Sequence, residues 1–576
     1  MNRVRIKIVG QSGSGLLSVG EIFSSAINGL GYHIVADREY PSLIKGGHSC
    51  FTINVSDKPF SSLSDSADVL VAIDKISMQE YLGTLSNGGI LIHGQGTAAT
   101  SITEKAKENG VKIFELDSKE IALASGGSAI TQNMVLAGMI WKVLGFEFDK
   151  IEKEVETRFK HLKKEILEAN IKCVKSGYEG VETVQGIWNI NTENADNILI
   201  DGSRAVALGA VACGVRAYYA YPMSPSSGIL AYLAEIAAKT DMIVKQAEDE
   251  ITASQMALGS MHMGTRAFVA TSGGGYDLMT ETVSLAGIME NPLVILIGQR
   301  PGPGTGLPTW TSQGDLDLAI YSAHGEFPRI VIGLSDSEDS FRLIGEAFNF
   351  SEKFQTPVIL LSEKTILESK MSVDKKFFDR EVEVERGLIE GPNNEEPKRG
   401  DRYKITDSGV SPKWIPGSGN EYYFANGDEH FENGDDTEKA DEVKLMYEKR
   451  MKKMTAIKAE LPAPEIFGVK ENADISFIGW GSSKNAMRDA IKIYEEKGVK
   501  VNYLHYSFVW PLEENSIKDF FARNKNVNLI EGNYLGQFGN IVESKTGVKF
   551  KNRLLKFDGR AFFIEDIIKF IDKNGL

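Results

Sequence analysis

The sequence predicts an α/β protein of three doubly wound domains, with helices on both faces of mainly parallel sheets, and one extended connecting arm. Short apolar runs alternate with amphipathic helical stretches over most of the 576 residues, as in successive strand–helix–strand units. Many of the predicted strands end in turns rich in glycine and serine. The alternation stops once, in a highly charged segment, and then resumes. This interruption separates the arm from a last domain.

The first domain is expected over residues 1–185. A strand pattern over residues 3–9 leads into the glycine-rich turn "GQSGSG" (10–15) and then into an amphipathic helix. A further strand pattern covers residues 68–75. Residues 131–178 are expected to be helical, and residues 149–178 carry the apolar stripe of a surface helix. The glycine turn before a helix has two interpretations: a loop whose backbone amides bind a phosphate group, or a tight turn without a ligand.

The second domain is expected over residues 190–370, where strand patterns again run into turns and helices. The stretch "AYPMSPSSGIL" (220–230) ends one strand with two prolines and offers Ser226 or Ser227 as the cap of the next helix. Arg300 closes another strand and precedes a loop with three prolines. A rigid loop that carries an arginine is suited to bidentate binding of a carboxylate, and the alternative is a surface arginine in a flexible loop. The prolines favour the rigid loop.

Three consecutive acids, Glu248, Asp249 and Glu250, stand where a strand pattern gives way to a helix. Acids in a first turn stabilise the helix dipole, which is a sufficient reason for two of them. A third carboxylate that faces inward, beside apolar strand residues, would have a raised pKa and could share a proton with a ligand nitrogen.

The connecting arm is expected over residues 371–468 and the last α/β domain over residues 469–576. In the arm the strand patterns disappear, and the stretch Gly427–Glu442 carries eight acidic residues against one lysine. We interpret this stretch as a solvated acidic loop. The alternative is a metal site formed by Asp428, Glu429, His430 and Glu432.

The composition excludes several classes of protein. A net charge of −15 argues against a nucleic-acid-binding face and against a membrane surface of anionic lipid. No apolar run is long enough for a signal sequence or a membrane span, so we expect a cytoplasmic protein. The cysteines, Cys50, Cys173 and Cys213, lie far apart and form no C-x-x-C motif. They therefore provide no disulfide framework, zinc site or iron–sulfur cluster.

Several motifs in this order resemble the α subunit of the 2-oxoacid:ferredoxin oxidoreductases. They are "YPMSPSSGI", "QAEDEITA", "GQRPGPGTGLPT", "QGDL", "HGEFPR" and "EGNYLGQFG". "GQSGSG" and "IKGGHS" resemble the γ domain of the same enzymes, fused at the N-terminus. The resemblance covers nearly the whole chain. It implies a γ-type domain over residues 1–185, a thiamine pyrimidine-binding-type domain over 190–370 and a transketolase C-terminal-type domain over 469–576.

Members of this family decarboxylate a 2-oxoacid on thiamine diphosphate, pass two electrons through iron–sulfur clusters to ferredoxin, and form an acyl-CoA. The resemblance implies that Glu248 hydrogen-bonds N1′ of the aminopyrimidine. It also implies that Arg300 holds the substrate carboxylate and that Thr309 contacts the substrate. The family motif Y-P-I-T-P-[SA]-S, where cofactor and substrate meet, corresponds here to Tyr221, Pro222, Met223 and Ser224.

The chain departs from the family pattern in two places. Met223 and Ser224 replace the usual isoleucine and threonine, so Ser224 keeps a hydroxyl group but lacks a methyl group. In the γ-type domain, Ser12 and Ser14 stand where glycine and glutamine are usual. Lys45, in "IKGGHS", is the candidate for binding CoA.

Two parts of the family's chemistry are missing from the chain: a G-D-G…N pattern for Mg²⁺ and the diphosphate, and any cluster ligands. The resemblance therefore implies a β subunit that supplies both, including a [4Fe–4S] cluster, with ferredoxin as the electron acceptor. No metal is expected on this chain, and the assembly is αβ or (αβ)2. The active site is expected at the subunit interface.

Three questions stay open at this point. 2-Oxoglutarate is the favoured substrate because the fused γ–α layout is common in enzymes that act on it, while pyruvate and branched-chain oxoacids are alternatives. A non-catalytic scaffold subunit is a second hypothesis for the function. A free-standing Rossmann dehydrogenase that uses the N-terminal glycine loop is a third.

Overall fold

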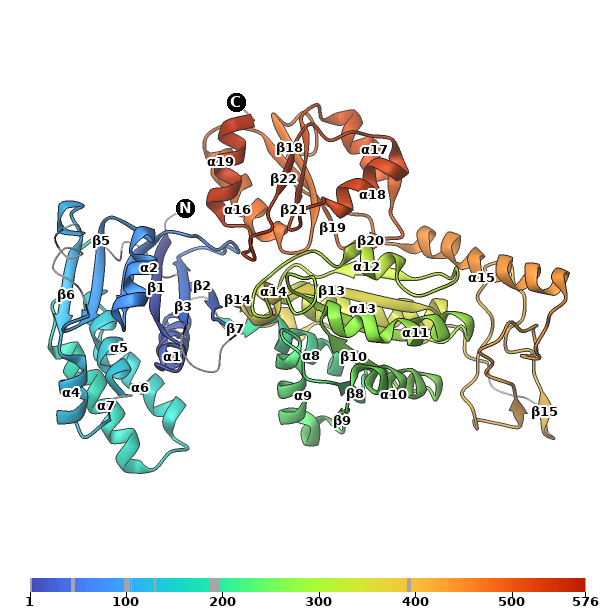
Figure 1. The fold of residues 1–576 in the computed structure, drawn as a ribbon, viewed down its shortest axis with the longest axis horizontal. Coiled ribbons are helices and arrows are strands. Elements are labelled where there is room, and N and C mark those ends of the chain that lie inside the picture. Colours follow the sequence, from blue (N-terminus) through green and yellow to red (C-terminus); the bar gives the residue numbers. More distant parts are fainter. Residues whose placement is uncertain are drawn as a thin grey trace. The chain divides into compact units, whose positions relative to one another are not determined.

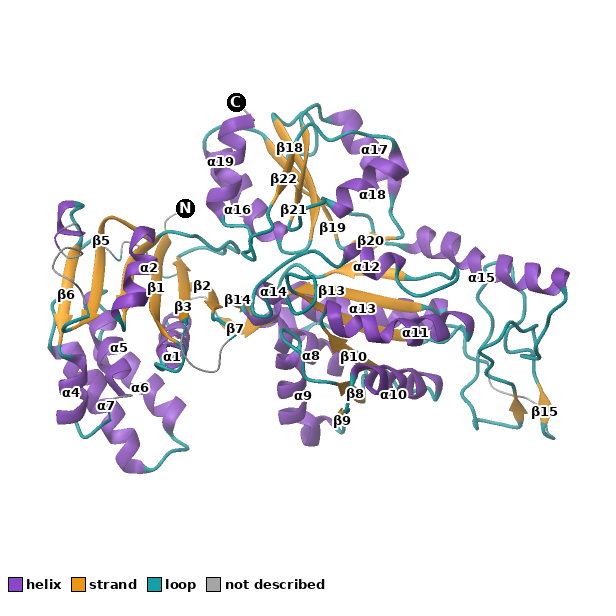
Figure 2. Ribbon diagram, viewed as in Figure 1, coloured by secondary structure: helices purple, strands orange, loops and turns teal. Residues whose placement is uncertain are grey.

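The computed structural model describes residues 3–42, 47–97, 104, 106–128, 131–186, 188, 192, 196–390 and 395–574. The chain divides into two compact units, which are described separately. The first comprises Met1–Ile200, Ser369–Asp379 and Phe563–Asp566, and the second comprises Asp201–Glu368, Arg380–Phe562 and Ile567–Leu576. Strands and helices alternate through both (Figures 1 and 2), so the predicted α/β class is confirmed.

The first unit contains an eight-stranded sheet in the order β6-β5-β4-β1-β3-β2-β14-β7. Its strands are β1 (Arg3–Gln11), β2 (His33–Glu39), β3 (His48–Ser56), β4 (Ala67–Ala72), β5 (Leu85–Gly94), β6 (Lys112–Leu116), β7 (Asn197–Asp201) and β14 (Lys370–Asp374). Strands β1, β4, β5 and β6 are parallel, whereas β3 is antiparallel to β1 and β2. The sheet is thus mixed. Strand β14 belongs to it, although the expected arm begins at residue 371.

Helices cover this sheet because its central strands are apolar on both faces. In β1, Ile6, Ile8 and Val9 are all buried, as in a strand covered on both sides. The helices are α1 (Leu16–Gly29), α2 (Lys75–Tyr81), α4 (Ser118–Ala124), α5 (Gln132–Val143), α6 (Phe148–Phe159) and α7 (Lys164–Glu179).

The second unit contains a seven-stranded sheet in the order β20-β12-β13-β11-β10-β8-β9. Its strands are β8 (Ala217–Ala220), β9 (Ile243–Gln246), β10 (Ala267–Thr271), β11 (Leu293–Gln299), β12 (Ile330–Gly333), β13 (Pro357–Glu363) and β20 (Phe508–Trp510). Its helices are α8 (Gly202–Ala212), α9 (Ser227–Thr240), α10 (Glu250–His262), α11 (Gly273–Ile288), α12 (Leu316–Tyr321), α13 (Ser337–Phe354) and α14 (Lys364–Glu368). All its strands are parallel except β20, which is antiparallel to β12.

A five-stranded sheet follows in the order β17-β19-β18-β21-β22. Its strands are β17 (Glu465–Gly468), β18 (Ile475–Trp480), β19 (Val501–Tyr506), β21 (Val527–Glu531) and β22 (Arg553–Leu555). Its helices are α16 (Ser483–Glu496), α17 (Glu514–Arg523), α18 (Gln537–Thr546) and α19 (Ile564–Asn574). Strand β20 comes from the same C-terminal region but pairs with the seven-stranded sheet. We call residues 465–562 and 567–574 of the second unit the C-terminal domain.

The arm is extended and has little regular structure before helix α15 (Ala440–Glu460), as Figure 1 shows at the right. Its acidic stretch is partly packed instead of fully solvated. Glu429 forms an ion pair with Arg450 of α15 at 2.5 Å, and His430 is fully buried against Tyr403. The acids of this stretch therefore hold the arm together.

Candidate functional site

The residues predicted to bind thiamine and the 2-oxoacid follow strands β8, β9 and β11, and β10 lies between β11 and β8. These four strands are parallel neighbours in the order β11-β10-β8-β9, so their carboxyl ends lie along one edge of the sheet. In open α/β sheets this edge is where ligands bind. The segments that leave the strands begin with Tyr221, Ala247, Ser272 and Arg300.

The turn after β8 packs against the neighbouring strands. Pro225 is buried, and an added Cβ on Gly298 of β11 would lie 2.9 Å from the Pro225 ring. Met223 reaches Ser272, whose hydroxyl donates to the Met223 sulfur. Ser226 occupies the position before α9, but its hydroxyl donates to the Met223 carbonyl and does not cap the helix. The turn therefore belongs to the sheet edge, while Tyr221 stays 39% exposed.

Arg300 is joined to this turn by a hydrogen bond. Its Nη1 donates to the backbone oxygen of Ser224 at 3.0 Å. Burial lowers the pKa of the guanidinium and Asp315 opposes that shift; an arginine stays charged at neutral pH. Thr309, nine residues later, is buried. The structure thus brings Arg300 next to Ser224, with the guanidinium half-buried at the edge of the sheet.

Asp315 was not singled out from the sequence, although it lies in the "QGDL" motif. Burial raises the pKa of its carboxyl to about 6, Asp277 adds to the shift and Arg300 opposes it. Its Oδ2 is buried and has no hydrogen-bond partner among the described residues. An added Cβ on Gly273, the first residue of α11, would lie 2.7 Å from that oxygen. The carboxyl of Asp315 therefore faces the start of α11, in the electrostatic field of Arg300.

The three consecutive acids occupy three different environments. Glu248 is exposed and accepts a hydrogen bond from the Thr252 hydroxyl at 3.0 Å. Asp249 caps α10 by accepting from the Thr252 amide at 2.8 Å. Glu250 is only 3% exposed, and its Oε1 is buried with no partner among the described residues. The inward-facing carboxylate is Glu250, two residues after the Glu248 that the family resemblance selects.

Gly275 of α11 leaves room for the Glu250 side chain. An added Cβ on Gly275 would lie 2.8 Å from the Glu250 Oε1. A buried carboxylate oxygen without a partner carries a large desolvation cost, so a hydrogen-bond donor on a ligand suits this position. A protonated ring nitrogen, or the amino group of an aminopyrimidine, has the required chemistry. The residues present therefore fit the pyrimidine half of thiamine diphosphate.

The N-terminal glycine loop has the hydrogen bonds of a tight turn. The amide of Gln11 donates to Asp74 Oδ2 at 2.7 Å, and the amide of Ser14 donates to the Gln11 carbonyl at 3.0 Å. Ser12 bonds both the Gly47 carbonyl and the Ser49 hydroxyl. These amides are already used within the protein. Lys45, the CoA candidate, lies outside the described residues.

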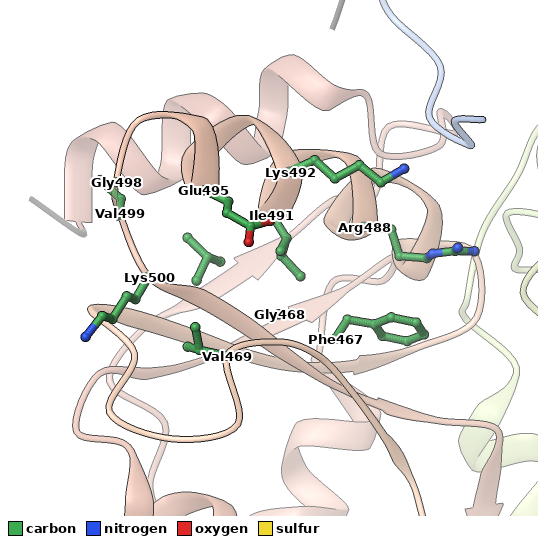
Figure 3. Close-up of a pocket in the computed structure, with 11 residues that line it drawn as sticks. Phe467, Gly468, Val469, Arg488, Ile491, Lys492, Glu495, Gly498, Val499 and Lys500 are labelled. Carbon is green, nitrogen blue, oxygen red and sulfur yellow. The ribbon is translucent and has the colours of Figure 1, made fainter. Parts of the chain in front are cut away.

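A groove of about 600 Å³ lies on the C-terminal domain, between β17 and α16 (Figure 3). Arg488 lies over the Phe467 ring, with 5.5 Å to the centroid. The groove is not uniformly positive, since Glu495 lines it together with Lys492 and Lys500. None of the predicted site residues lines it, so the groove is separate from the sheet edge described above.

Two kinds of feature are absent from the part of the chain that the structure describes. Its His, Cys, Asp and Glu side chains form no group of three or more that could hold a metal ion. None of its helices combines the length and apolar character that crossing a bilayer requires.

Three family models match the chain. The model described as pyruvate flavodoxin/ferredoxin oxidoreductase, thiamine diphosphate-binding, matches residues 208–449. The pyruvate ferredoxin/flavodoxin oxidoreductase model matches residues 5–180, and the pyruvate:ferredoxin oxidoreductase core domain II model matches residues 473–567.

Relatives and one solved structure match over the full length. The chain is 30% identical to the 2-oxoacid:ferredoxin oxidoreductase subunit alpha of Saccharolobus solfataricus, over 100% of this chain and 98% of that protein. It is 26% identical to the 2-oxoglutarate oxidoreductase subunit KorA of Mycobacterium tuberculosis, over 99% and 91%. A structure of 2-oxoglutarate:ferredoxin oxidoreductase from Magnetococcus marinus, with 2-oxoglutarate, coenzyme A and succinyl-CoA bound, has a TM-score of 0.92 at 26% identity and covers all of both chains. By these matches, the chain belongs to the 2-oxoacid:ferredoxin oxidoreductases, as an alpha subunit.

Proposed function

We propose that the chain is the catalytic α subunit of a thiamine diphosphate-dependent enzyme that oxidises 2-oxoglutarate. In this reaction the 2-oxoacid and CoA give succinyl-CoA and CO2, and the two electrons released reduce ferredoxin. The proposal rests on one observation above the others: Glu250, after β9, presents a buried oxygen that has no hydrogen-bond partner among the described residues. Arg300 follows β11 along the same edge of the sheet and brings a positive charge to it.

Thiamine diphosphate, when bound, supplies the group that stabilises the carbanion left by decarboxylation. The residues of this chain have other tasks. Glu250 accepts a hydrogen bond from a ring nitrogen of the aminopyrimidine and keeps a proton at that nitrogen. Arg300, fixed by the Ser224 carbonyl, binds the carboxylate next to the 2-oxo group with its remaining N–H donors. Thr309 contacts the substrate from the far end of the same loop, and the segment Tyr221–Ser224 forms the wall between cofactor and substrate.

A second subunit completes the enzyme in this proposal. It supplies the Mg²⁺ and diphosphate site and the [4Fe–4S] cluster. The three cysteines of this chain are buried and far apart in the sequence, so they do not form a four-cysteine ligand set. CoA enters as co-substrate, and Lys45 stays a candidate for its binding.

The choice of 2-oxoglutarate is supported by the relatives named for it and by the bound ligands of the Magnetococcus structure. Family membership leaves no reason to retain the Rossmann dehydrogenase hypothesis. Pyruvate, branched-chain oxoacids and a scaffold role are the alternatives that an assay must separate.

The test is reconstitution with a thiamine-binding, cluster-bearing partner subunit. Reduction of methyl viologen is measured with CoA and 2-oxoglutarate, pyruvate or 2-oxoisovalerate. We expect 2-oxoglutarate to give the highest kcat/KM. A higher kcat/KM with pyruvate would identify pyruvate as the preferred substrate, and the proposed type of reaction would be unchanged. No reduction with any 2-oxoacid, in a complex that binds thiamine diphosphate, would favour the scaffold.

A further inference from the structure

The loop between β11 and α12 is anchored at both ends and exposed between them. Arg300 begins it, residues 302–307 are exposed, and Thr309, Thr311 and Gln313 are buried again. Strand β11 and the Ser224 carbonyl hold the Arg300 end. The other end, which carries Thr309, is held mainly by the C-terminal domain.

Gln313 makes most of that connection. Its side-chain Nε2 donates to Glu363 Oε1 at 2.9 Å and to the Trp480 carbonyl at 3.0 Å, and its Oε1 accepts from the Gly532 amide. Its backbone amide donates to the Gly532 carbonyl at 2.9 Å, and its own carbonyl accepts from Asn533 Nδ2 at 2.9 Å. Every polar group of the residue is bonded, and it is 1% exposed.

Two buried glutamates determine which kind of side chain is suited to position 313. Glu363, at the end of β13, accepts from the Ser482 amide and hydroxyl at 2.9 and 2.6 Å, and burial raises its pKa. Glu531, at the end of β21, accepts from Trp480 Nε1 and Asn533 Nδ2, and burial raises its pKa as well. A neutral amide, which donates to Glu363 and accepts from Gly532, suits a place beside these two carboxyls better than a third acid.

Two glycines of the C-terminal domain lie so close to the Gln313 side chain that a larger residue at either position would collide with it. An added Cβ on Gly481 would lie 2.4 Å from Gln313 Nε2, and one on Gly532 would lie 3.0 Å from its Oε1. Nearby, the Thr311 amide donates to the Gly559 carbonyl at 3.0 Å, and the Arg560 guanidinium lies 3.6 Å from the centroid of the Trp310 ring. The C-terminal domain thus contacts the loop at residues 310, 311 and 313, all shortly after Thr309.

We propose that Gln313 is a positioning residue for substrate binding, which clamps the loop end that carries Thr309 so that Thr309 keeps a fixed place relative to Arg300. This rests on the proposed function, in which both residues contact the 2-oxoacid. Gln313 itself touches neither substrate nor cofactor. A loop held at one end only must be ordered when substrate binds, and that cost weakens binding without altering the chemistry.

The test compares Gln313→Leu with Gln355→Leu, a matched loss of a buried glutamine that bonds the Ser411 carbonyl, away from the loop. Hydrogen exchange of the amides in residues 301–314 is followed in the full chain. KM, kcat and thiamine diphosphate affinity are measured in the complex with the partner subunit. We expect Gln313→Leu to exchange at least about tenfold faster in the loop. Its KM for the 2-oxoacid should rise at least about tenfold, with kcat within about threefold and cofactor affinity unchanged.

A pH readout distinguishes positioning from general destabilisation. Gln313→Glu places a third carboxyl beside Glu363 and Glu531. When that carboxyl is protonated, its O–H can donate a hydrogen bond to Glu363, as the Gln313 amide does in the wild type. We expect its KM to return towards the wild-type value as the pH falls. If Gln313→Leu does not fold, Arg560→Ala loosens the same loop end from the solvent side and should raise KM about threefold.

Unchanged loop exchange in Gln313→Leu would overturn the proposal, as would a KM rise of the same size in Gln355→Leu. If the wild-type complex does not turn over any 2-oxoacid, the proposed function is refuted, and the role of Gln313 in substrate binding is refuted with it. The hydrogen-exchange rate of the loop in Gln313→Leu tests separately whether Gln313 clamps the loop.

Discussion

Arg300 Nη1 donates a hydrogen bond of 3.0 Å to the backbone oxygen of Ser224. The two residues are separated by 76 positions in the chain and follow strands β11 and β8, which both pair with β10. One N–H of the guanidinium is therefore used for orientation. This arrangement lets an arginine bind a carboxylate in a set direction.

Replacement of Arg300 by alanine should weaken substrate binding selectively. A charge-assisted hydrogen bond contributes about 1.5–3 kcal/mol, so KM for the 2-oxoacid is expected to rise roughly 10- to 150-fold. The affinity for thiamine diphosphate should stay within about twofold. The control is Arg204→Ala, which removes a partly exposed ion pair with Asp201. Steady-state viologen reduction measures KM for both variants. A wild-type KM in Arg300→Ala would exclude this residue from substrate binding.

Glu250 and Glu248 can be separated by isosteric substitutions. Glu250→Gln removes the only one of the two carboxylates that is buried and is expected to lower kcat by a factor of about 10² to 10⁴, the usual range for a lost general acid–base group. Glu248→Gln, at an exposed position, should keep near-wild-type activity. The opposite pattern, an inactive Glu248→Gln with an active Glu250→Gln, would support the assignment made from the family resemblance.

Asp315 should make the stability of the chain depend on pH. Its pKa is raised to about 6 by burial, against about 3.9 in an unfolded chain. The folded state therefore favours the protonated carboxyl, and stability is lost as the pH rises from about 4 to about 6. Asp315→Asn removes this loss. The free energy of unfolding of the variant should exceed that of the wild type by about 1–3 kcal/mol at pH 7.5 and by little at pH 4.5. Thermal unfolding at both pH values, with exposed Asp519→Asn as the control, measures the difference. An equal change in stability at both pH values would contradict a raised pKa of Asp315 as the cause.

The arm helix should depend on one buried acid. Glu290 forms ion pairs with Lys449 and Lys453 of α15 at 2.5 Å each, and all three side chains are at most 1% exposed. Glu290→Gln leaves two buried ammonium groups without a counter-charge, and a loss of about 3–5 kcal/mol is expected. Lys449→Met keeps the Glu290–Lys453 pair and should cost clearly less. Lys444→Met, which breaks an exposed pair with Glu448, should change the unfolding free energy by less than about 0.5 kcal/mol. Equal losses in Glu290→Gln and Lys449→Met would contradict this account.

Much of the fold and part of the site could be predicted from local patterns. Apolar runs that end in glycine-rich turns, such as 267–273 and 293–300, predicted parallel strands followed by helices or loops. The same patterns placed Arg300 at a strand end. Burial and strand alternation depend on residues close together in the sequence, which is why these features could be recognised.

Other features depend on contacts between distant residues. Three adjacent acids look alike in the sequence, and only the packing of α10 against its neighbours turns Glu250 inward and leaves Glu248 in solvent. Strand β20 crosses from the C-terminal region to the middle sheet, and Gln313 meets Gly532 from 219 positions away. Local patterns predict which segments become strands and helices, because backbone geometry and side-chain polarity act over short distances. Which side chain lacks a partner, and which loop is clamped, follows from the folded chain, since burial and hydrogen bonding arise when distant segments exclude water together.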